Sequence, residues 1–520
     1  MKQVFFFWGL CFLFHLTAYT QEAFNPIIFA DVPDMSMIRV GRTYYMSSTT
    51  MHLSPGVPIM RSYDLTNWKI VNYAYDTLAS VDDLNLDNGK STYGRGSWAS
   101  SLRYRDSIFY VSTFAQTTGK TYIFSTKDIE KGPWNVHSFK PAYHDHTLFF
   151  DDDGRVYMIY GAGKLKLIEL SKDLSGLKPG TTEQVIIENA DLPAGSNIGL
   201  HAEGSQLFKI NGTYYLFNIV WPKGGVRTVL IHRSDKISGP WEGRVALQDR
   251  GIAQGGMIDS PEGKWYAYLF RDYGAVGRIP YISPVTWEDG WPVIGINNKI
   301  PDSLELAKNL SPIPGLVNSD EFTRTKGDPD LPLVWQWNHN PDNTHWSVHS
   351  RKGFLRITTS RIDTSFYLVK NIVGQRTFGP SCSGSIAIHT THMKDGDVAG
   401  LTLFQKKYGY IGVKLENGKK QIIQVAVDSD IPMVKATIPF NQNTLYLKSE
   451  CDFKELKDEG RFYYSLDNKT WILIGSTLKL KYTLPHFMGY RFGLFNYATK
   501  YAGGYVDFDW FRISSNTSDK

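Results

Sequence analysis

From about residue 24 onward, short runs of alternating apolar and polar residues are separated by turns rich in glycine, proline and asparagine. Alternation with a period of two is typical of β-strands that bury one face and expose the other. Past the N-terminus, no window shows the longer period and the caps of a stable helix. The pattern predicts an all-β protein.

An aromatic hairpin signature recurs five times between residues 24 and 300. Each copy places a turn before an apolar or aromatic strand, and the copies stand roughly 50 to 65 residues apart. Repetition of a small antiparallel unit at this spacing is typical of propeller blades. The first domain is therefore predicted to be a five-bladed β-propeller over residues 21–310. Its signatures end at Tyr45, Tyr110, Tyr157, Tyr215 and Tyr266.

The five copies share one further register position. Counting back eleven or twelve residues from each final tyrosine reaches Asp34, Trp98, Asp145, Glu203 and Gln254. Equivalent positions on the innermost strands of a propeller converge on its axis. We therefore expect two aspartates, one glutamate, one tryptophan and one glutamine to face a single pocket, which is the candidate active site.

A second pattern follows a break in the chain. Residues 311–319 are rich in proline and glycine and predict a linker. From Asp320, alternating strands with turn signals about every ten residues predict a β-sandwich over residues 320–514. Residues 515–520 are predicted to be a polar tail. The predicted fold class is thus all-β, a propeller followed by a sandwich.

The size and charge of the chain agree with this organisation. A chain of 520 residues is longer than a domain with a single hydrophobic core usually is, which favours two domains. Aromatic residues reach 14%, as expected for an all-β protein. The net charge is +5 and the sequence has no lysine or arginine block, so nucleic acid is not an expected partner.

The N-terminal segment has the form of a secretory signal peptide. Lys2 precedes an apolar run of about ten residues, and Ala18 to Thr20 offer a small-x-small cleavage site. The run is too short to span a bilayer. Residues 1–20 are therefore predicted to direct export to the periplasm or the cell exterior, with no membrane span.

Removal of this segment would take Cys11 with it and leave Cys382 and Cys451. An exported protein can join such a pair in a disulfide. Two buried thiols are the alternative, and the sequence leaves both open.

Several carboxylates around a sugar-sized pocket suit glycoside hydrolysis. One acid must protonate the leaving oxygen, and another must stay ionised to activate water or attack carbon. A third acid can raise the pKa of the proton donor by like-charge repulsion and can orient it. A single carboxylate at a strand start is more often structural, but three in one register together with Trp98 favour a catalytic site.

The segments that carry these residues resemble glycoside hydrolase family 43. The resemblance covers the whole propeller and implies five blades and inversion of the anomeric configuration. Beyond the propeller, the chain is similar to the xylosidase and arabinofuranosidase branch, which implies a concanavalin-like jelly roll for the sandwich. The matching stretches are NPIIFADVPDMSMIRVGRTYYM, GSWASSLRYRDSIFY, HDHTLFFDDDGRVYMIYG, HAEGSQLFKINGTYYLF and GAVGRIPYISPVTWEDGWPVIG.

The resemblance implies a role for each matched residue. Asp34, in Pro-Asp-Met-Ser, takes the place of the general base, and Glu203, in Ala-Glu-Gly-Ser, that of the general acid. Asp145 corresponds to the aspartate that tunes the pKa of the acid and orients it. Trp98 and Arg278 correspond to residues that contact the sugar.

Other nearby residues fit the family pattern less well. Asp31 competes with Asp34 but lies outside both the register and the motif. Gln254 stands where many members have an axial histidine that binds a metal or water cluster. No cofactor is therefore predicted to be required and no metal site is predicted; a structural Ca²⁺ is left open but is not predicted. His144 and His201 are interpreted as structural.

The stretch from residue 47 to residue 60 is expected beside the leaving-group side of the pocket. Within it, Met51 and His52 are the candidates for substrate contact, together with Gln254 on the axis. These positions lie in a loop after the first inner hairpin, where substrate specificity is commonly set.

These observations predict an exo-acting, inverting glycoside hydrolase that releases a terminal pentose from plant cell-wall polysaccharides or oligosaccharides. α-L-Arabinofuranose is favoured, and a β-D-xylosidase with the same mechanism is the alternative. A non-catalytic carbohydrate-binding propeller is a third reading from another class, which the intact carboxylates oppose. The sequence leaves open the natural polymer, the linkage, the oligomeric state and whether the sandwich binds sugar.

Overall fold

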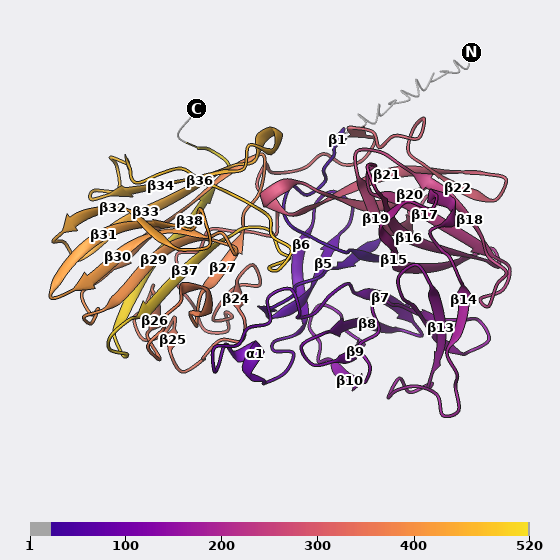
Figure 1. Ribbon diagram of the computed structural model, residues 1–520, viewed down its shortest axis with the longest axis horizontal. Coiled ribbons are helices and arrows are strands. Elements are labelled where there is room, and N and C mark those ends of the chain that lie inside the picture. The colour runs from indigo at the N-terminus through magenta and orange to yellow at the C-terminus, as the bar shows by residue number, and fades with distance from the viewer. Residues whose placement is uncertain (1–21, 518–520) are drawn as a thin grey trace, which may run out of the picture.

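The computed structural model describes residues 22–517 and consists almost entirely of β-strands (Figure 1). Two lobes lie side by side, the propeller in indigo to magenta and the sandwich in orange to yellow. The predicted all-β class, a five-bladed propeller followed by a sandwich, is confirmed. The predicted signal peptide, residues 1–20, lies outside the described residues. Among residues 22–517, no helix is both long and apolar enough to cross a membrane.

Each of the five blades is a four-stranded antiparallel sheet whose strands follow one another in the chain. The hairpin signatures form the first two strands of each blade, as the repeat predicted. The blades comprise β2 (Ser36–Val40), β3 (Thr43–Ser47), β5 (Gly56–Ser62) and β6 (Lys69–Tyr75); β7 (Ser101–Arg105), β8 (Ile108–Ala115), β9 (Lys120–Thr126) and β10 (Asn135–Phe139); β11 (Thr147–Phe150), β12 (Val156–Tyr160), β13 (Leu165–Leu170) and β14 (Gln184–Ile187); β15 (Ile198–Ile210), β16 (Thr213–Pro222), β17 (Thr228–Ser234) and β18 (Glu242–Leu247); and β19 (Ile252–Asp259), β20 (Trp265–Asp272), β21 (Arg278–Glu288) and β22 (Trp291–Ile294).

The innermost strands close into a ring, because β2, β7, β11, β15 and β19 each contact the next and β19 contacts β2. The two ends of the propeller also meet, since β1 (Ala23–Phe24) pairs with β23 (Ser303–Leu304). Strand β12 shows how apolar sequence builds this packing. All five of its residues are buried, because Tyr157 and Ile159 pack with the next blade while the alternating residues face the opposite side.

The sandwich consists of two large antiparallel sheets. One sheet has the order β32-β31-β30-β29-β37-β27-β24-β4, and the other β25-β26-β38-β28-β33-β34-β35 with β36 beside β34. Cys382 and Cys451 are buried, directly opposed and not joined by a disulfide. The strands are β4 (Leu53–Ser54), β24 (Gln336–Asn338), β25 (Trp346–Ser347), β26 (Leu355–Thr358), β27 (Val373–Arg376), β28 (Ser381–His389), β29 (Asp397–Phe404), β30 (Gly409–Glu416), β31 (Lys419–Ala426), β32 (Met433–Phe440), β33 (Thr444–Asp452), β34 (Glu459–Ser465), β35 (Ile472–Leu473), β36 (Leu478–Lys479), β37 (Arg491–Ala498) and β38 (Tyr505–Ser514).

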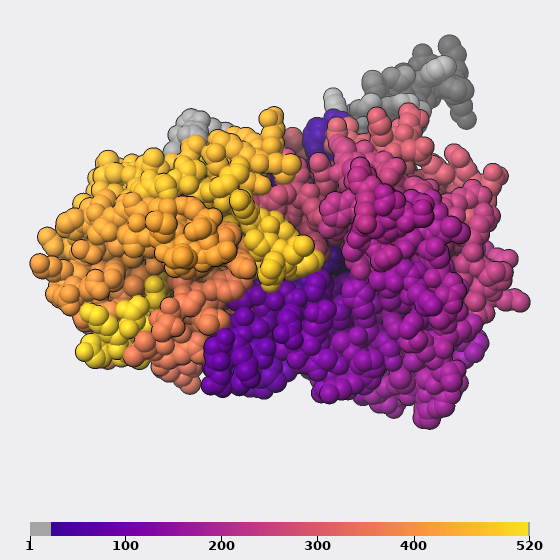
Figure 2. Space-filling view, in the orientation of Figure 1, coloured from indigo at the N-terminus to yellow at the C-terminus, as the bar shows by residue number. Residues whose placement is uncertain are grey.

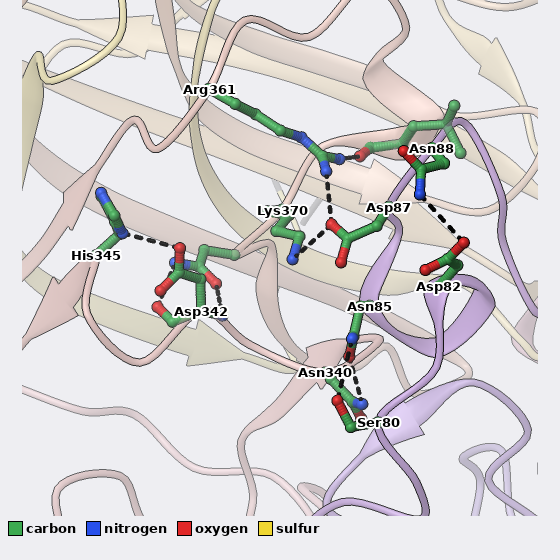
Figure 3. A network of polar contacts seen from close by, with 12 residues as sticks. Ser80, Asp82, Asn85, Asp87, Asn88, Asn340, Asp342, His345, Arg361 and Lys370 are labelled. Carbon is green, nitrogen blue, oxygen red and sulfur yellow. Dashed lines mark hydrogen bonds and ion pairs between the residues drawn. The ribbon is translucent and has the colours of Figure 1, made fainter.

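The two lobes share main-chain pairing and a polar interface. Strand β4 comes from the propeller part of the chain, yet it pairs with β24 and extends a sandwich sheet. Near α1 (Asp82–Asn85), Asp87 forms ion pairs with Arg361 at 3.2 Å and with Lys370 at 3.1 Å (Figure 3). Asn340 donates to the Asn85 side chain at 2.9 Å in the same network. The lobes are therefore docked by specific contacts.

Three histidines are buried together at this interface. His52 of the propeller packs against His339 and His486 of the sandwich, with ring centroids 4.9 and 4.8 Å apart, and against Tyr93 at 4.5 Å. Burial lowers the pKa of all three histidines, and their mutual repulsion adds to the effect for His52. For His486 the pKa falls to about 3. The cluster is neutral at pH 7.

We expect acid to destabilise the protein through this cluster. Because the pKa of each histidine is lower in the folded state, the unfolded state binds more protons once the pH is below about 6.5. The free energy of unfolding therefore falls as the pH falls from 6.5. Three such groups lower the free energy of unfolding by up to about 4 kcal/mol per pH unit. Calorimetry between pH 7.5 and 5 should show a steep fall in Tm.

His486→Gln should flatten that dependence. His201→Gln is the matched control, because the His201 side chain is 64% exposed and lies outside the interface. A pH slope that is the same in both variants and the parent would contradict this role of the cluster.

Candidate active site

The predicted site residues gather at the axial ends of the inner strands. Each final tyrosine pairs with an inner-strand residue, and Asp34, Asp145 and Gln254 lie four residues before that partner. Trp98 and Glu203 lie five residues before it. The shared register is therefore offset by one residue in the second and fourth blades.

The main chain is distorted at this position. Asp34, Asp145 and Gln254 have φ angles of 51°, 46° and 53° in the left-handed region, and Gly204 holds the matching place in the fourth blade at 66°. Such angles are unfavourable for residues other than glycine and tend to occur at functional sites. A Cβ on Gly204 would lie 2.8 Å from the Gln254 side chain, so the fourth blade has no room for a side chain there.

Asp34 is held as a buried carboxylate by two neighbours. Its Oδ1 accepts from the Arg278 guanidinium at 2.8 Å, and its Oδ2 accepts from the Thr49 hydroxyl at 2.7 Å. Asp34 is 5% exposed. Burial opposes the charge of Arg278, but Asp34 and Asp272 raise its pKa, so Arg278 is a permanent cation beside the carboxylate.

Asp145, His144 and Glu203 form the opposite side of the site. The His144 Nε2 lies 2.9 Å from the Glu203 carboxylate and 3.9 Å from that of Asp145. Burial raises the pKa of Asp145, while the charge of His144 lowers it. Burial disfavours the imidazolium, but Asp145 and Glu203 raise the pKa of His144 above its ordinary value. Sequence reasoning assigned His144 a structural role, whereas the structure joins it to Glu203.

A segment of the sandwich completes the site. The Phe487 ring lies 4.7 Å from that of Trp98 and 4.4 Å below the Arg278 guanidinium. Met488 packs with Met51 in the same apolar cluster. Figure 2 shows the yellow C-terminal surface reaching across to the propeller beside a hollow between the lobes. No local pattern pointed to Phe487, since its contact with Trp98 joins residues more than 380 positions apart in the chain.

Asp31, the competing aspartate, has a different environment. Its two carboxylate oxygens accept from the main-chain N–H groups of Arg278 and Gly489, both at 2.8 Å. Asp31 therefore ties the sandwich segment to the propeller through main-chain groups. The Arg278 guanidinium instead pairs with the side chain of Asp34. This arrangement agrees with the choice of Asp34 over Asp31.

The two loop candidates separate in the structure. Met51 packs with Trp98 and Phe487 at the edge of the site, although it is only 1% exposed. His52 is also 1% exposed, and its ring contacts are with Tyr93 and the two interface histidines. The structure therefore does not bring His52 to the site, because the chain turns at Met51 and directs the next side chain into the domain interface.

Gln254 lines a small axial cavity with Asp34 and Asp145. Separately, one ligand atom each from His144, Asp145 and Glu203 lie within 4.8 Å of one another and could hold a cation. A metal ion there would occupy the carboxylate proposed as proton donor. Binding would therefore inhibit hydrolysis.

Comparison with known proteins identifies the two lobes. Residues 23–292 match the model of glycosyl hydrolases family 43, which covers the propeller. Residues 319–514 match the β-xylosidase C-terminal concanavalin A-like domain. The chain belongs to glycosyl hydrolase family 43. It is therefore a glycoside hydrolase, as the resemblance in its motifs predicted.

Several family 43 relatives share the full arrangement. A β-xylosidase of Formosa agariphila is 29% identical, and the match covers 94% of this chain and 89% of that protein. A non-reducing end α-L-arabinofuranosidase of Bacteroides ovatus is 25% identical, with 74% of each chain covered. A solved structure described as a bifunctional GH43-CE of Bacteroides eggerthii is 64% identical with a TM-score of 0.95. The match covers 96% of this chain but spans 64% of that one.

Replacing His144 should shift the pH dependence of hydrolysis. In His144→Gln, the carboxyl of Asp145 loses the neighbouring charge that lowers its pKa, so its pKa should rise. The acidic limb of the kcat/KM profile should then move to higher pH. His201→Gln is the control, because His201 lies on the same strand as Glu203 but is paired with Asp191 at 2.6 Å, and this variant should leave the profile unchanged. An unmoved acidic limb in His144→Gln would show that this contact is structural.

Proposed function

We propose that this family 43 member is an exo-acting, inverting glycoside hydrolase that removes one terminal pentose from plant cell-wall glycans. The observation that carries the proposal is the grouping of Asp34, Asp145 and Glu203 at one end of the propeller axis beside Phe487 of the sandwich. Closure of one side by Phe487 and Met488 favours attack at a chain end over attack within a chain.

In the proposed reaction, Asp34 is the general base and activates a water molecule. Its ion pair with Arg278 holds the carboxylate in place near the axis. Glu203 is the general acid and protonates the leaving oxygen. Asp145 and His144 orient the Glu203 carboxyl group, and His144 also offsets its charge. Direct displacement by water needs about 6.5–9.5 Å between the carboxyl groups of base and acid. We expect Asp34 and Glu203 to meet this requirement.

The identity of the pentose is a finer proposal. The sequence favoured α-L-arabinofuranosides, and the B. ovatus relative carries an arabinofuranosidase name. The relatives from F. agariphila, Xylanibacter ruminicola and Bacillus subtilis carry β-xylosidase names. We therefore propose β-D-xylosides and α-L-arabinofuranosides as the two substrate classes, and direct comparison of kcat/KM on each ranks them.

The test uses xylo-oligosaccharides and arabinoxylan, with nitrophenyl β-D-xyloside and α-L-arabinofuranoside alongside. Release of a single pentose, seen by NMR first as the anomer of inverted configuration, supports the proposal. Release of internal fragments would rule out exo action, and a retained configuration would rule out the mechanism. Binding without turnover of any glycan would favour the carbohydrate-binding alternative.

We further propose that the enzyme needs no metal and acts outside the cytoplasm. The carboxylates supply both proton transfers, and Gln254 offers an amide where a histidine would offer a better ligand. Extensive chelation should leave kcat unchanged. Fractionation of cells that express the full chain should place the activity in the periplasm or medium.

A further inference from the structure

The inner hairpin of the fourth blade continues past the site, at the end of the propeller that carries it. In the first three blades the site residue precedes the inner strand, whereas Glu203 lies inside β15, which begins at Ile198 and has 13 residues. Glu203 is opposite Ile219 of β16, and the pairing extends outward to Leu200 opposite Trp221. Trp221 therefore lies about 7 Å further along β16 than the partner of Glu203. This extension forms a rim beside the proposed proton donor.

Trp221 is exposed on this rim and is held by its own loop. It is 44% exposed, more than any other tryptophan within residues 22–517. Its indole Nε1 donates to the Gly225 carbonyl at 3.0 Å, and the Arg227 guanidinium lies 5.3 Å from the ring centroid. A hydrogen bond at the edge of the indole and a cation over the ring restrict the side chain. A ring that is already ordered loses little entropy when a ligand stacks on it.

Arg227 connects this loop to the residues around Asp34. Its Nη2 lies 2.7 Å from the Asp272 carboxylate at the end of β20. The other oxygen of Asp272 lies 3.4 Å from Nε of Arg278, whose Nη1 donates to Asp34 at 2.8 Å. Positive and negative groups thus alternate from the Trp221 loop to the proposed base. The chain of contacts makes Trp221 part of the edge of this site.

The position of the rim determines which part of a glycan it can meet. The terminal pentose is held at the axis, and Phe487 and Met488 close one side, so the rest of the glycan must pass over an open part of the rim. Glu203 protonates the leaving oxygen, which places the leaving chain on the side of the fourth blade. Pyranose rings have a flat face of C–H groups, and an indole offers a large flat apolar surface to such a face.

We propose that Trp221 is the platform for the leaving part of the glycan, on which a pyranose ring of the chain stacks. The inference rests on the exo action proposed above and adds the residue that selects the leaving group. Contact with a part of the substrate remote from the scissile bond can be used to lower the barrier to reaction. Trp221 therefore favours oligosaccharides over glycosides with a small leaving group.

The first test compares two substrates that release the same pentose. Xylotriose has two leaving sugars, whereas methyl β-D-xyloside has a methyl group that cannot reach Trp221. An arabinofuranosyl xylobiose and methyl α-L-arabinofuranoside form the second pair. In Trp221→Ala, the kcat/KM for the oligosaccharide divided by that for the methyl glycoside should fall roughly tenfold. A loss of folded protein cancels in this ratio.

Two further variants show whether the effect belongs to the platform. Trp221→Phe keeps an aromatic ring and should retain most of the ratio. Tyr63→Ala is the matched control, because Tyr63 is 64% exposed and has the Arg61 guanidinium 5.0 Å from its ring centroid. Tyr63 follows β5 at the opposite end of the propeller, so its removal should leave the ratio at the parent value. An unchanged ratio in Trp221→Ala, or an equal fall in Tyr63→Ala, would overturn the proposal.

The same measurements separate this inference from the proposed function. A parent that releases no pentose from either pair would contradict both. A parent that releases pentose, with a ratio that Trp221→Ala leaves unchanged, would contradict the platform alone.

The second test is structural. Crystals of Glu203→Gln with the oligosaccharide that the parent cleaves should show a leaving sugar ring within about 4 Å of the Trp221 indole. A leaving chain that passes over another part of the rim would also overturn the proposal.

Discussion

Asp34→Ala should abolish hydrolysis of every substrate, with kcat falling by roughly 10²- to 10⁴-fold on natural and activated glycosides alike. Water must be activated whatever the leaving group, so a better leaving group cannot compensate for loss of the base. The buried ion pair with Arg278 adds a second consequence, since the variant leaves that cation without its 2.8 Å partner. Steady-state kinetics on oligosaccharides and nitrophenyl glycosides measure the loss.

Two controls separate a catalytic loss from misfolding. Added azide should restore turnover in Asp34→Ala by entering the vacated space, and should give a glycosyl azide of inverted configuration. Thr49→Val removes the other hydrogen bond to Asp34 but keeps the carboxylate, so it should retain most of the activity. A loss in Thr49→Val as large as that in Asp34→Ala, or no rescue by azide, would argue against Asp34 as base.

Glu203→Gln should affect substrates according to their leaving groups. Oligosaccharides leave as poor alkoxides and need the proton, so their kcat/KM should fall by roughly 10²- to 10⁴-fold. A dinitrophenyl glycoside leaves as a stable phenolate and should be affected far less. A plot of log kcat/KM against leaving-group pKa for a series of phenyl glycosides should become steeper in the variant.

Glu183→Gln provides the matched control, because this glutamate of the third blade pairs with Lys166 far from the axis. It should leave both classes of substrate unaffected. If Glu203→Gln reduced the turnover of activated and natural substrates equally, the assignment of Glu203 as proton donor would fail.

The repeat in the sequence predicted most of the architecture and the grouping of three carboxylates at one site. Five hairpin signatures define five blades because each blade is a local antiparallel unit whose strands follow one another in the chain. The same register led to Asp34, Asp145 and Glu203, since equivalent inner-strand positions converge on the axis. The motifs around these residues resembled family 43, and the match of residues 23–292 to that family confirmed it.

The shared register was less accurate where the hairpins of the blades differ in geometry. In the blades with two-residue turns at Asp106–Ser107 and Asn211–Gly212, Trp98 and Glu203 lie five residues before the strand partner of the tyrosine, whereas Asp145 lies four residues before it. Counting along the chain cannot distinguish this offset from a change in turn length. The left-handed conformations of Asp34, Asp145 and Gln254 were also invisible in the pattern.

Local sequence therefore determined the blades, the sandwich strands and the three carboxylates, because each depends on residues close together in the chain or on a repeated unit. Only the tertiary structure decided what surrounds them. Phe487 reaches Trp98 and His52 turns into the interface through contacts between segments far apart in sequence. Such contacts depend on how two complete domains fit together, and no periodicity within either domain encodes that fit.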